Sequence, residues 1–336
     1  MASTQSSGAT RAEQAVAAVL PSPADVTLAG AGERYDLVVN GQQLQVKWIG
    51  EGRLGDVRRL LTDREERPDV VVARRLSPGA RAALADAEIG WVDETGAAEI
   101  AIGQIIVSRS GIDVPRARRP PGWTPSVLAI AEAALCGVTP TTSTMRAATG
   151  LSTGSCVTAL RVLTDLGLLE ASAARGRDSA RRVADPDRLL DAYATAAASL
   201  APDLRLEVGV TWRDFADGVR SVGRRWDKQG YDYAVTGALG AELLAPYLTT
   251  VSTADVYVST ETFIGLQAAA TSVGLKPIVG GRLVLRPVPT VAVSRLATIV
   301  DGVRVAPWPR VYVDLLAAGV RGEDAAEHLR ETVRAR

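Results

Sequence analysis

The chain has 336 residues, and its 38 lysine and arginine residues balance 38 aspartate and glutamate residues, so its formal charge is zero. A hydrophobic content of 47% and a charged content of 23% are typical of a folded globular protein and argue against disorder. Two cysteines cannot form a disulfide framework, and a single histidine, His328, argues against histidine triads and histidine metal sites. We therefore expect a cytoplasmic protein of two or three domains without a cofactor, a metal or a membrane span.

The first expected domain, residues 1–108, contains a predicted hairpin. Two strand-like segments flank Asn40-Gly41, a pair that favours a type I′ turn. Such a turn sets Val39 opposite Gln42, Leu37 opposite Leu44, and Asp36 opposite Gln45. The strands are expected at Arg34–Val39 and Gln42–Ile49, followed by a helix at Leu54–Glu66, a buried strand at Asp69–Ala73, a helix at Pro78–Ala87, and strands near Trp91 and at Ala97–Ile102.

Alternation along the hairpin places Asp36, Gln45 and Lys47 on one face. An Asp in one strand and a Gln-x-Lys in the next resemble the restriction-endonuclease-like fold and its D…(D/E/Q)xK motif. In that motif acidic residues bind a divalent cation and the lysine lies near the attacking water. Because Gln45 replaces the second carboxylate, we expect a nuclease-like fold without catalysis. Two alternatives are a metal-dependent DNA nuclease that uses these three residues, and a hairpin with one core face and one solvated face.

The net charge differs between segments of the chain. Residues 1–108 carry 11 basic and 15 acidic side chains, whereas residues 109–182 carry 10 and 5, a net charge of +5. The positive segment begins with a Pro/Arg-rich linker, residues 109–123, in which prolines favour an extended conformation. Its Arg116, Arg118 and Arg119 could lie in a DNA minor groove, as extended basic arms do.

Residues 124–200 show the periodicity of three helices and two strands. Thr124-Pro125 should begin the first helix, Ser143 should cap a short helix at Thr144–Thr149, and Ser152 should cap a third helix to about Asp165. The third helix should turn Val157, Leu160, Leu163 and Leu166 inward. A strand, a tight turn at 175–178 and a returning strand follow. This order resembles a winged helix-turn-helix domain.

The resemblance implies that the third helix enters the major groove while the wing contacts the backbone. The helix would offer Thr153, Ser155, Thr158 and Arg161, and the wing would offer Arg175, Arg177, Arg181 and Arg182. The alternative is a three-helix module that mediates protein contacts.

Residues 201–336 resemble the minimal nucleotidyltransferase fold. A strand, a turn at Gly237, a helix, and a strand bearing Asp255 follow one another, and a strand pair is expected around Gly280-Gly281. Active members hold two metal ions with a DxD on the second strand. Here that segment is Asp255-Val256-Tyr257, so the second acid is missing, and we expect no nucleotide transfer.

A family resemblance covers most of the chain. The segments that carry the resemblance are PDVVVARRLSPGARAAL, IGWVDETGAAEI, VTGALGAELL, DVYV, GGRLVLRPV, RVAPWPRVYVDLL and GEDAAEHLRE. With the winged helix, they resemble the AbiEi-type antitoxins of type IV toxin–antitoxin systems and related transcription regulators. The resemblance implies sequence-specific binding of double-stranded DNA, with the C-terminal domain as the antitoxin or interaction part. A nucleotidyltransferase toxin or RNA polymerase would be the protein partner, and the oligomeric state stays open.

Overall fold

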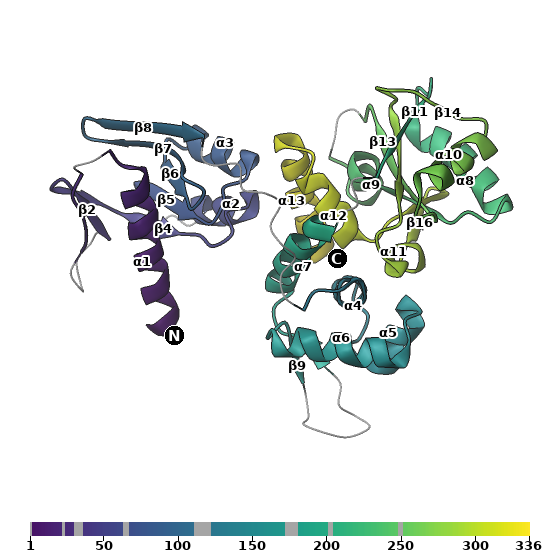
Figure 1. The fold of residues 1–336 in the computed structure, drawn as a ribbon, viewed down its shortest axis with the longest axis horizontal. Helices are drawn as coiled ribbons and strands as arrows, with labels where there is room; N and C mark the ends of the chain where they lie inside the picture. The colour runs from purple at the N-terminus through teal and green to yellow at the C-terminus, as the bar shows by residue number, and fades with distance from the viewer. Residues whose placement is uncertain are drawn as a thin grey trace. The chain divides into compact units, whose positions relative to one another are not determined.

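Figure 1 shows a computed structural model of the chain. It describes residues 2–21, 24–29, 36–62, 67–110, 122–171, 181–200, 204–247 and 251–336. The chain forms two compact units, one of Met1–Pro115 with Gly319–Asp324 and one of Arg116–Ala318 with Ala325–Arg336. Both combine helices with sheets, which confirms the expected mixed α/β, multidomain class. Every helix in the described residues is too short or too polar to traverse a bilayer.

The first unit combines a three-stranded antiparallel sheet, β1-β2-β3, with a five-stranded sheet in the order β4-β5-β6-β7-β8. Strands β4, β5 and β6 run parallel, and β7 and β8 complete the sheet in antiparallel fashion. The elements are α1 (Ala2–Val19), β1 (Val26–Leu28), β2 (Leu37–Val39), β3 (Gln42–Leu44), β4 (Val46–Trp48), α2 (Leu54–Thr62), β5 (Val70–Ala73), α3 (Pro78–Asp86), β6 (Gly90–Asp93), β7 (Ala97–Ile102) and β8 (Ile105–Ser110).

Helices cover both faces of the five-stranded sheet. Along β5, Val70 and Val72 belong to the core that contains Val16 of α1, whereas Val71 belongs to the core that contains Leu84 of α3. This division follows from the alternation of side chains along a strand. A strand buried on both faces must be apolar throughout, and the Val-Val-Val-Ala sequence of β5 meets that requirement.

The predicted hairpin register is confirmed at its tip and differs at its base. Val39 pairs with Gln42 and Leu37 with Leu44, around a turn in which Asn40 and Gly41 have φ of 49° and 82°. The expected strand to Ile49 is instead interrupted at Gln45, after which β4 pairs with β5. The expected pairing of Asp36 with Gln45 is absent from the ladder: the Asp36 amide donates to the Leu44 carbonyl at 2.9 Å, and the Gln45 amide donates to Asp69 Oδ2 at 2.8 Å.

The second unit holds the remaining elements, apart from Val320–Asp324 at the start of α13, around one continuous apolar core. They are α4 (Pro125–Leu135), α5 (Thr142–Thr149), α6 (Thr153–Asp165), β9 (Leu169–Ala171), β10 (Arg181–Val183), α7 (Pro186–Leu200), β11 (Leu206–Gly209), α8 (Phe215–Lys228), β12 (Tyr233–Thr236), α9 (Gly237–Leu244), β13 (Ala254–Val258), α10 (Phe263–Ser272), β14 (Lys276–Pro277), β15 (Leu283–Pro287), α11 (Val291–Arg295), β16 (Thr298–Val300), β17 (Val303–Val305), α12 (Trp308–Leu316) and α13 (Val320–Arg334).

The seven-stranded sheet of this unit has the order β14-β11-β15-β13-β12-β17-β16. The prediction of a strand pair around Gly280-Gly281 was wrong, because β11 lies between β14 and β15 and pairs with both. Gly281 permits this insertion, since a Cβ there would lie 2.4 Å from the Val208 carbonyl oxygen. Pairing between strands distant in sequence therefore replaced the local hairpin.

Two details of the three-helix segment differ from expectation. The α5 cap is Thr141, whose hydroxyl accepts from the Thr144 amide, and not Ser143. Val157 of α6 is 40% exposed and Leu166, the C-cap that follows α6, is 38% exposed, so neither points inward. The buried stripe instead consists of Cys156, Ala159, Leu160 and Leu163. These positions follow the 3.6-residue period, whereas the predicted three-residue spacing winds around the helix.

The buried stripe of α6 predicts unequal effects of two truncations. Leu160→Ala removes a fully buried side chain and should lower the free energy of unfolding by about 2–5 kcal/mol. Val157→Ala, on the exposed face of the same helix, should change it by about 0.5 kcal/mol or less. Urea denaturation of both variants measures the difference, and equal effects would contradict the orientation of α6.

Candidate nucleic-acid interface

Helices α4, α5 and α6 form a compact three-helix arrangement whose ends are fixed by local sequence. The Thr124 hydroxyl caps α4 and the Ser152 hydroxyl caps α6 by accepting from the Ser155 amide at 3.1 Å. Helix α5 ends at Gly150, which has φ of 72° in the left-handed region. Glycine adopts that conformation readily, so α5 can end and α6 can begin within three residues.

The exposed face of α6 carries three of the four side chains of this helix that were expected to contact DNA. Thr153, Thr158 and Arg161 are exposed, as expected for base or phosphate contact. Ser155 is half-buried, and its hydroxyl lies 3.0 Å from the Ser152 hydroxyl, so it serves the helix cap. The helix thus presents two threonine hydroxyls and one guanidinium on a rigid element.

An antiparallel strand pair, β9 and β10, follows α6 and carries two of the expected wing arginines. Arg181 Nε donates to Thr164 Oγ1 of α6 at 3.1 Å, which ties the strand pair to the helix. Arg182 forms an ion pair with Glu170 on the neighbouring strand, and both side chains are at least half exposed. An exposed pair of this kind is worth about 0–1 kcal/mol, so exchanging Glu170 for a phosphate costs little.

Five other expected DNA contacts lie outside the described residues. They are the wing-tip residues Arg175 and Arg177, and the linker residues Arg116, Arg118 and Arg119.

Two arginines near α5 were not among the expected contacts. Arg146 is an exposed residue of α5. Arg295 of α11 lies against Gly150, where a Cβ would approach its Nε to 2.5 Å. Helical periodicity could have predicted that Arg146 is exposed, because it lies between the buried positions Met145 and Thr149. Arg295 could not, because it follows Gly150 by 145 residues and only the tertiary fold joins them.

Of the three nuclease-like residues, Asp36 lies just before β2, Gln45 lies between β3 and β4, and Lys47 lies on β4 of the five-stranded sheet, so the expected shared face of one hairpin is not formed. Asp36 and Lys47 are exposed and Gln45 is half-buried, but Asp36 Oδ2 accepts a hydrogen bond from the Val46 amide at 2.9 Å. A divalent cation prefers several carboxylate oxygens, and this set offers one carboxylate and one neutral amide. Within the described ranges, no group of three or more acidic, histidine or cysteine side chains could hold a metal ion. The residues present therefore do not fit the metal that the motif implies.

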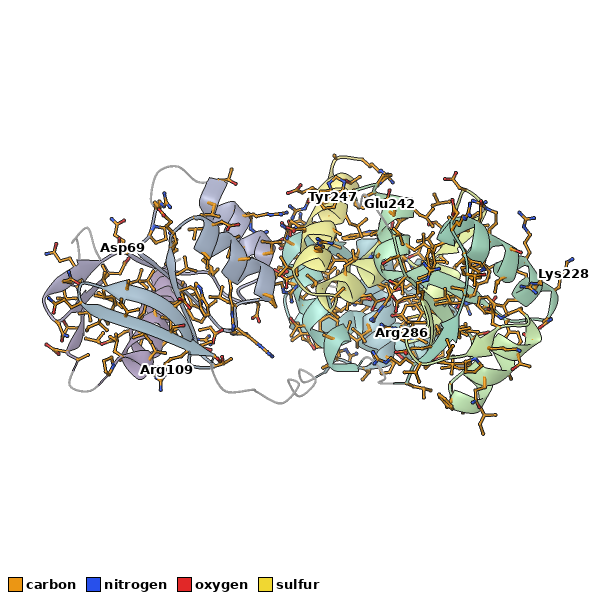
Figure 2. The ribbon with its side chains drawn as sticks, turned by 90° about the horizontal axis from the view of Figure 1, so that it is seen from above. Asp69, Arg109, Lys228, Glu242, Tyr247 and Arg286 are labelled. Atoms are coloured by element: carbon orange, nitrogen blue, oxygen red, sulfur yellow. The ribbon has the colours of Figure 1, made fainter. Side chains whose placement is uncertain are left out.

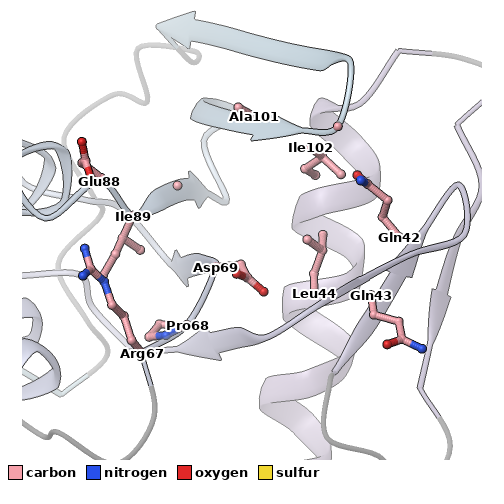
Figure 3. A pocket seen from close by; sticks show the side chains of 12 residues that line it. Gln42, Gln43, Leu44, Arg67, Pro68, Asp69, Glu88, Ile89, Ala101 and Ile102 are labelled. Carbon is pink, nitrogen blue, oxygen red and sulfur yellow. The ribbon is translucent and has the colours of Figure 1, made fainter.

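A cleft of about 650 Å³ opens beside the same hairpin (Figure 3). Its polar side chains are those of Gln42, Gln43, Arg67, Asp69 and Glu88. Asp69 is engaged, because its Oδ2 accepts from the Gln45 amide. The cleft carries charges of both signs on a solvated rim, and its lining does not select one class of ligand.

The nucleotidyltransferase-like residues meet at the start of α9. Gly237 has φ of 60°, and a Cβ there would lie 3.2 Å from Asp255 Oδ2, so glycine is required. Asp255 is in turn paired at 2.8 Å with Arg286, which is labelled in Figure 2. Burial raises the pKa of Asp255 above its usual value, although Arg286 opposes that rise. An arginine therefore partners the carboxylate that would ligate a metal in the active fold.

A second carboxylate, Asp314 of α12, faces the same side of the sheet and is also paired with an arginine. Arg310 Nη2 lies 2.5 Å from Asp314 Oδ1, and both side chains are almost fully buried. The hydroxyls of Thr236 and Tyr257 donate to Asp314 Oδ2 at 2.5 and 2.7 Å. Burial alone would raise the pKa of Asp314, but Arg310 and these two donors hold it below its usual value. Periodicity gave no signal for this network, because its members come from β12, β13 and α12.

Comparison of the chain with protein-family models, curated proteins and solved structures found no match.

The Arg310–Asp314 pair predicts a large loss of stability when one partner is removed. Arg310→Met leaves Asp314 as a buried, uncompensated carboxylate and should lower the free energy of unfolding by about 3–5 kcal/mol. Arg225→Met, at an exposed position of α8, is the matched control and should change it by about 0.5 kcal/mol or less. Chemical denaturation at neutral pH measures both, and an unchanged Arg310→Met would contradict the pair.

Proposed function

We propose that the chain is a sequence-specific double-stranded DNA-binding transcription regulator of antitoxin-like type that acts without catalysis. The observation that carries the proposal is the exposed face of α6, with Thr153, Thr158 and Arg161 beside a strand pair that bears Arg181 and Arg182. A helix of about this length fits the major groove, with the strand pair against the backbone.

The distribution of charge supports this proposal. Although the whole chain is neutral, residues 109–182 carry a net charge of +5. Cations concentrated on one segment attract phosphates and release counterions on binding, so affinity should fall steeply as salt rises. The acidic balance of residues 1–108, 11 basic against 15 acidic side chains, assigns this attraction to the second unit.

The two arginine environments suggest different roles. The exposed Arg161 guanidinium, on a rigid helix, is suited to the paired acceptors of a guanine edge. Arg182, paired with Glu170 at the surface, is suited to a phosphate. In this proposal, α6 supplies sequence selection and the strand pair supplies general affinity.

The C-terminal sheet is proposed as the protein-interaction part, with a nucleotidyltransferase toxin or RNA polymerase as partner. The ion pairs Asp255–Arg286 and Asp314–Arg310 support a binding role without nucleotide transfer, because arginines neutralise both carboxylates. Affinity capture from cells, with toxin and polymerase as the two expected outcomes, distinguishes these partners.

Two substitutions in the full chain test the DNA proposal. Arg161→Ala should weaken binding to duplex from the upstream region of its own gene by about 1–3 kcal/mol and relax sequence preference. Arg182→Ala should weaken binding to all sequences and reduce the slope of log affinity against log salt by about 1. Fluorescence anisotropy between low and physiological salt measures both effects.

Arg225→Ala removes an equal charge from an exposed site on α8 and is the control, with affinity and slope expected to match those of the unaltered chain. Binding that is independent of salt, or equally affected by all three substitutions, would contradict the proposal. Cleavage of duplex with Mg²⁺ or Mn²⁺ that disappears in Lys47→Ala would instead support the nuclease alternative.

A further inference from the structure

Glu132 is a carboxyl group enclosed within the second unit that the proposed DNA contacts do not use. It lies in the middle of α4 and is fully buried. Its Oε2 accepts a hydrogen bond from the Tyr193 hydroxyl of α7 at 2.8 Å. Its Oε1 is buried without a hydrogen-bond partner among the described residues. A buried carboxylate normally requires more than one donor, so this site stabilises the ionised form poorly.

The surroundings of Glu132 connect the three-helix segment to the sheet. Charged and titratable groups reach it from α7 as Tyr193, from α12 as Arg310 and Asp314, and from the end of its own helix as Cys136. Arg310 is engaged by Asp314 at 2.5 Å, and Asp314 is held by β12 and β13. Arg310 therefore attracts Glu132 without bonding to it.

A second contact shows that α4 and α12 are fixed to each other at this place. The indole Nε1 of Trp308, at the first position of α12, donates to the Leu135 carbonyl at the last position of α4 at 3.2 Å. Helix α4 in turn packs on α6, the helix proposed to enter the major groove. A change in how α4 sits on α12 would thus alter the support of α6.

We propose that Glu132 is a proton-operated switch at this joint: the neutral carboxyl keeps α4 and α7 packed on α12, and its ionisation loosens that packing and weakens DNA binding. The proposal rests on the proposed function, because it concerns regulation of the same DNA-binding face. The ligand of the switch is the proton itself.

The direction of the effect follows from the burial of the group. Burial raises the pKa of Glu132 from 4.5 to about 7, while Tyr193 and Arg310 oppose the rise. A raised carboxyl pKa means that the folded protein holds the proton more tightly than the unfolded chain does. The stability from this group is therefore complete below pH 4.5 and is lost as pH rises to about 7.

Burial also raises the pKa of Asp255 and of Glu323, so the comparison with Glu132→Gln is needed to isolate this titration. Histidine is the residue type that ordinarily titrates near neutrality, and His328 is the single histidine of the chain. It stacks on Tyr247 with ring centroids 4.7 Å apart and is not among the groups that influence the pKa of Glu132. His328→Asn is therefore a suitable control for the pH experiment.

The test uses the full chain and measures the thermal midpoint by circular dichroism, and the affinity for its upstream duplex, at several pH values from 5.5 to 8 and constant ionic strength. Relative to Glu132→Gln, the unaltered chain should lose stability as pH rises to about 7 and then level off. Its dissociation constant for DNA should rise about tenfold across the range, which corresponds to a one-unit shift of the carboxyl pKa on binding.

A second variant, Tyr193→Phe, removes the donor to Oε2 and should move the transition to higher pH, since the hydrogen bond favours the ionised form. If Tyr193 acted only in packing, Tyr193→Phe would leave the pH of the transition unchanged. His328→Asn should follow the unaltered chain.

Identical pH profiles for the unaltered chain and Glu132→Gln would overturn the switch. So would a Glu132-dependent melting profile with a pH-independent DNA affinity. A Glu132-dependent melting profile without DNA binding at any pH would instead contradict the proposed function, so the two failures are distinguishable.

Discussion

The second unit depends on how it accommodates ionisable side chains that it buries between its helices and its sheet. Glu132, Arg310 and Asp314 all lie in the interior. Removing charges from water costs several kcal/mol per ion, so such a group persists only where its partners are held in place. Thr236 and Tyr257 hold Asp314, Asp314 holds Arg310, and Tyr193 holds Glu132. Asp314 thus joins α12 to the sheet and Glu132 joins α4 to α7, while the charge of Arg310 acts on Glu132 between them.

This constraint connects the fold to the proposed function. DNA recognition requires that α6 be presented rigidly, and α6 is supported by α4 through the apolar core. The same sheet face that holds Asp314 also holds Asp255, and each carboxylate is paired with an arginine. In active members of the nucleotidyltransferase fold, this face of the sheet binds metal. Here ion pairs occupy it, and we propose that this face stabilises the fold and contacts a partner protein. In the first unit, the hairpin likewise directs the Asp36 carboxylate to a backbone amide.

Local chemistry made much of the fold predictable. The Asn40-Gly41 turn, the Ser152 cap and the Gly150 stop depend on neighbouring residues, and the structure places each where the sequence indicated. Errors arose where distant segments compete with local pairing. The insertion of β11 between β14 and β15 is one case, and the bond from Gln45 to Asp69 that interrupts the strand is another. The exposure of Thr153, Thr158 and Arg161 on α6 could be predicted from the sequence. The positions of Arg295 and of the groups around Glu132 could not, because helices and strands far apart in sequence bring them together.

We propose that α6 and the adjoining strand pair, β9 and β10, form the DNA-binding face. Hydrogen exchange of the full chain, with and without the duplex from its own upstream region, tests it most directly. We expect DNA to slow exchange of the backbone amides in Thr153–Asp165 and Arg181–Val183, and to leave those of the β2-β3 hairpin, Leu37–Leu44, unchanged. Protection of the hairpin without protection of α6 would contradict it.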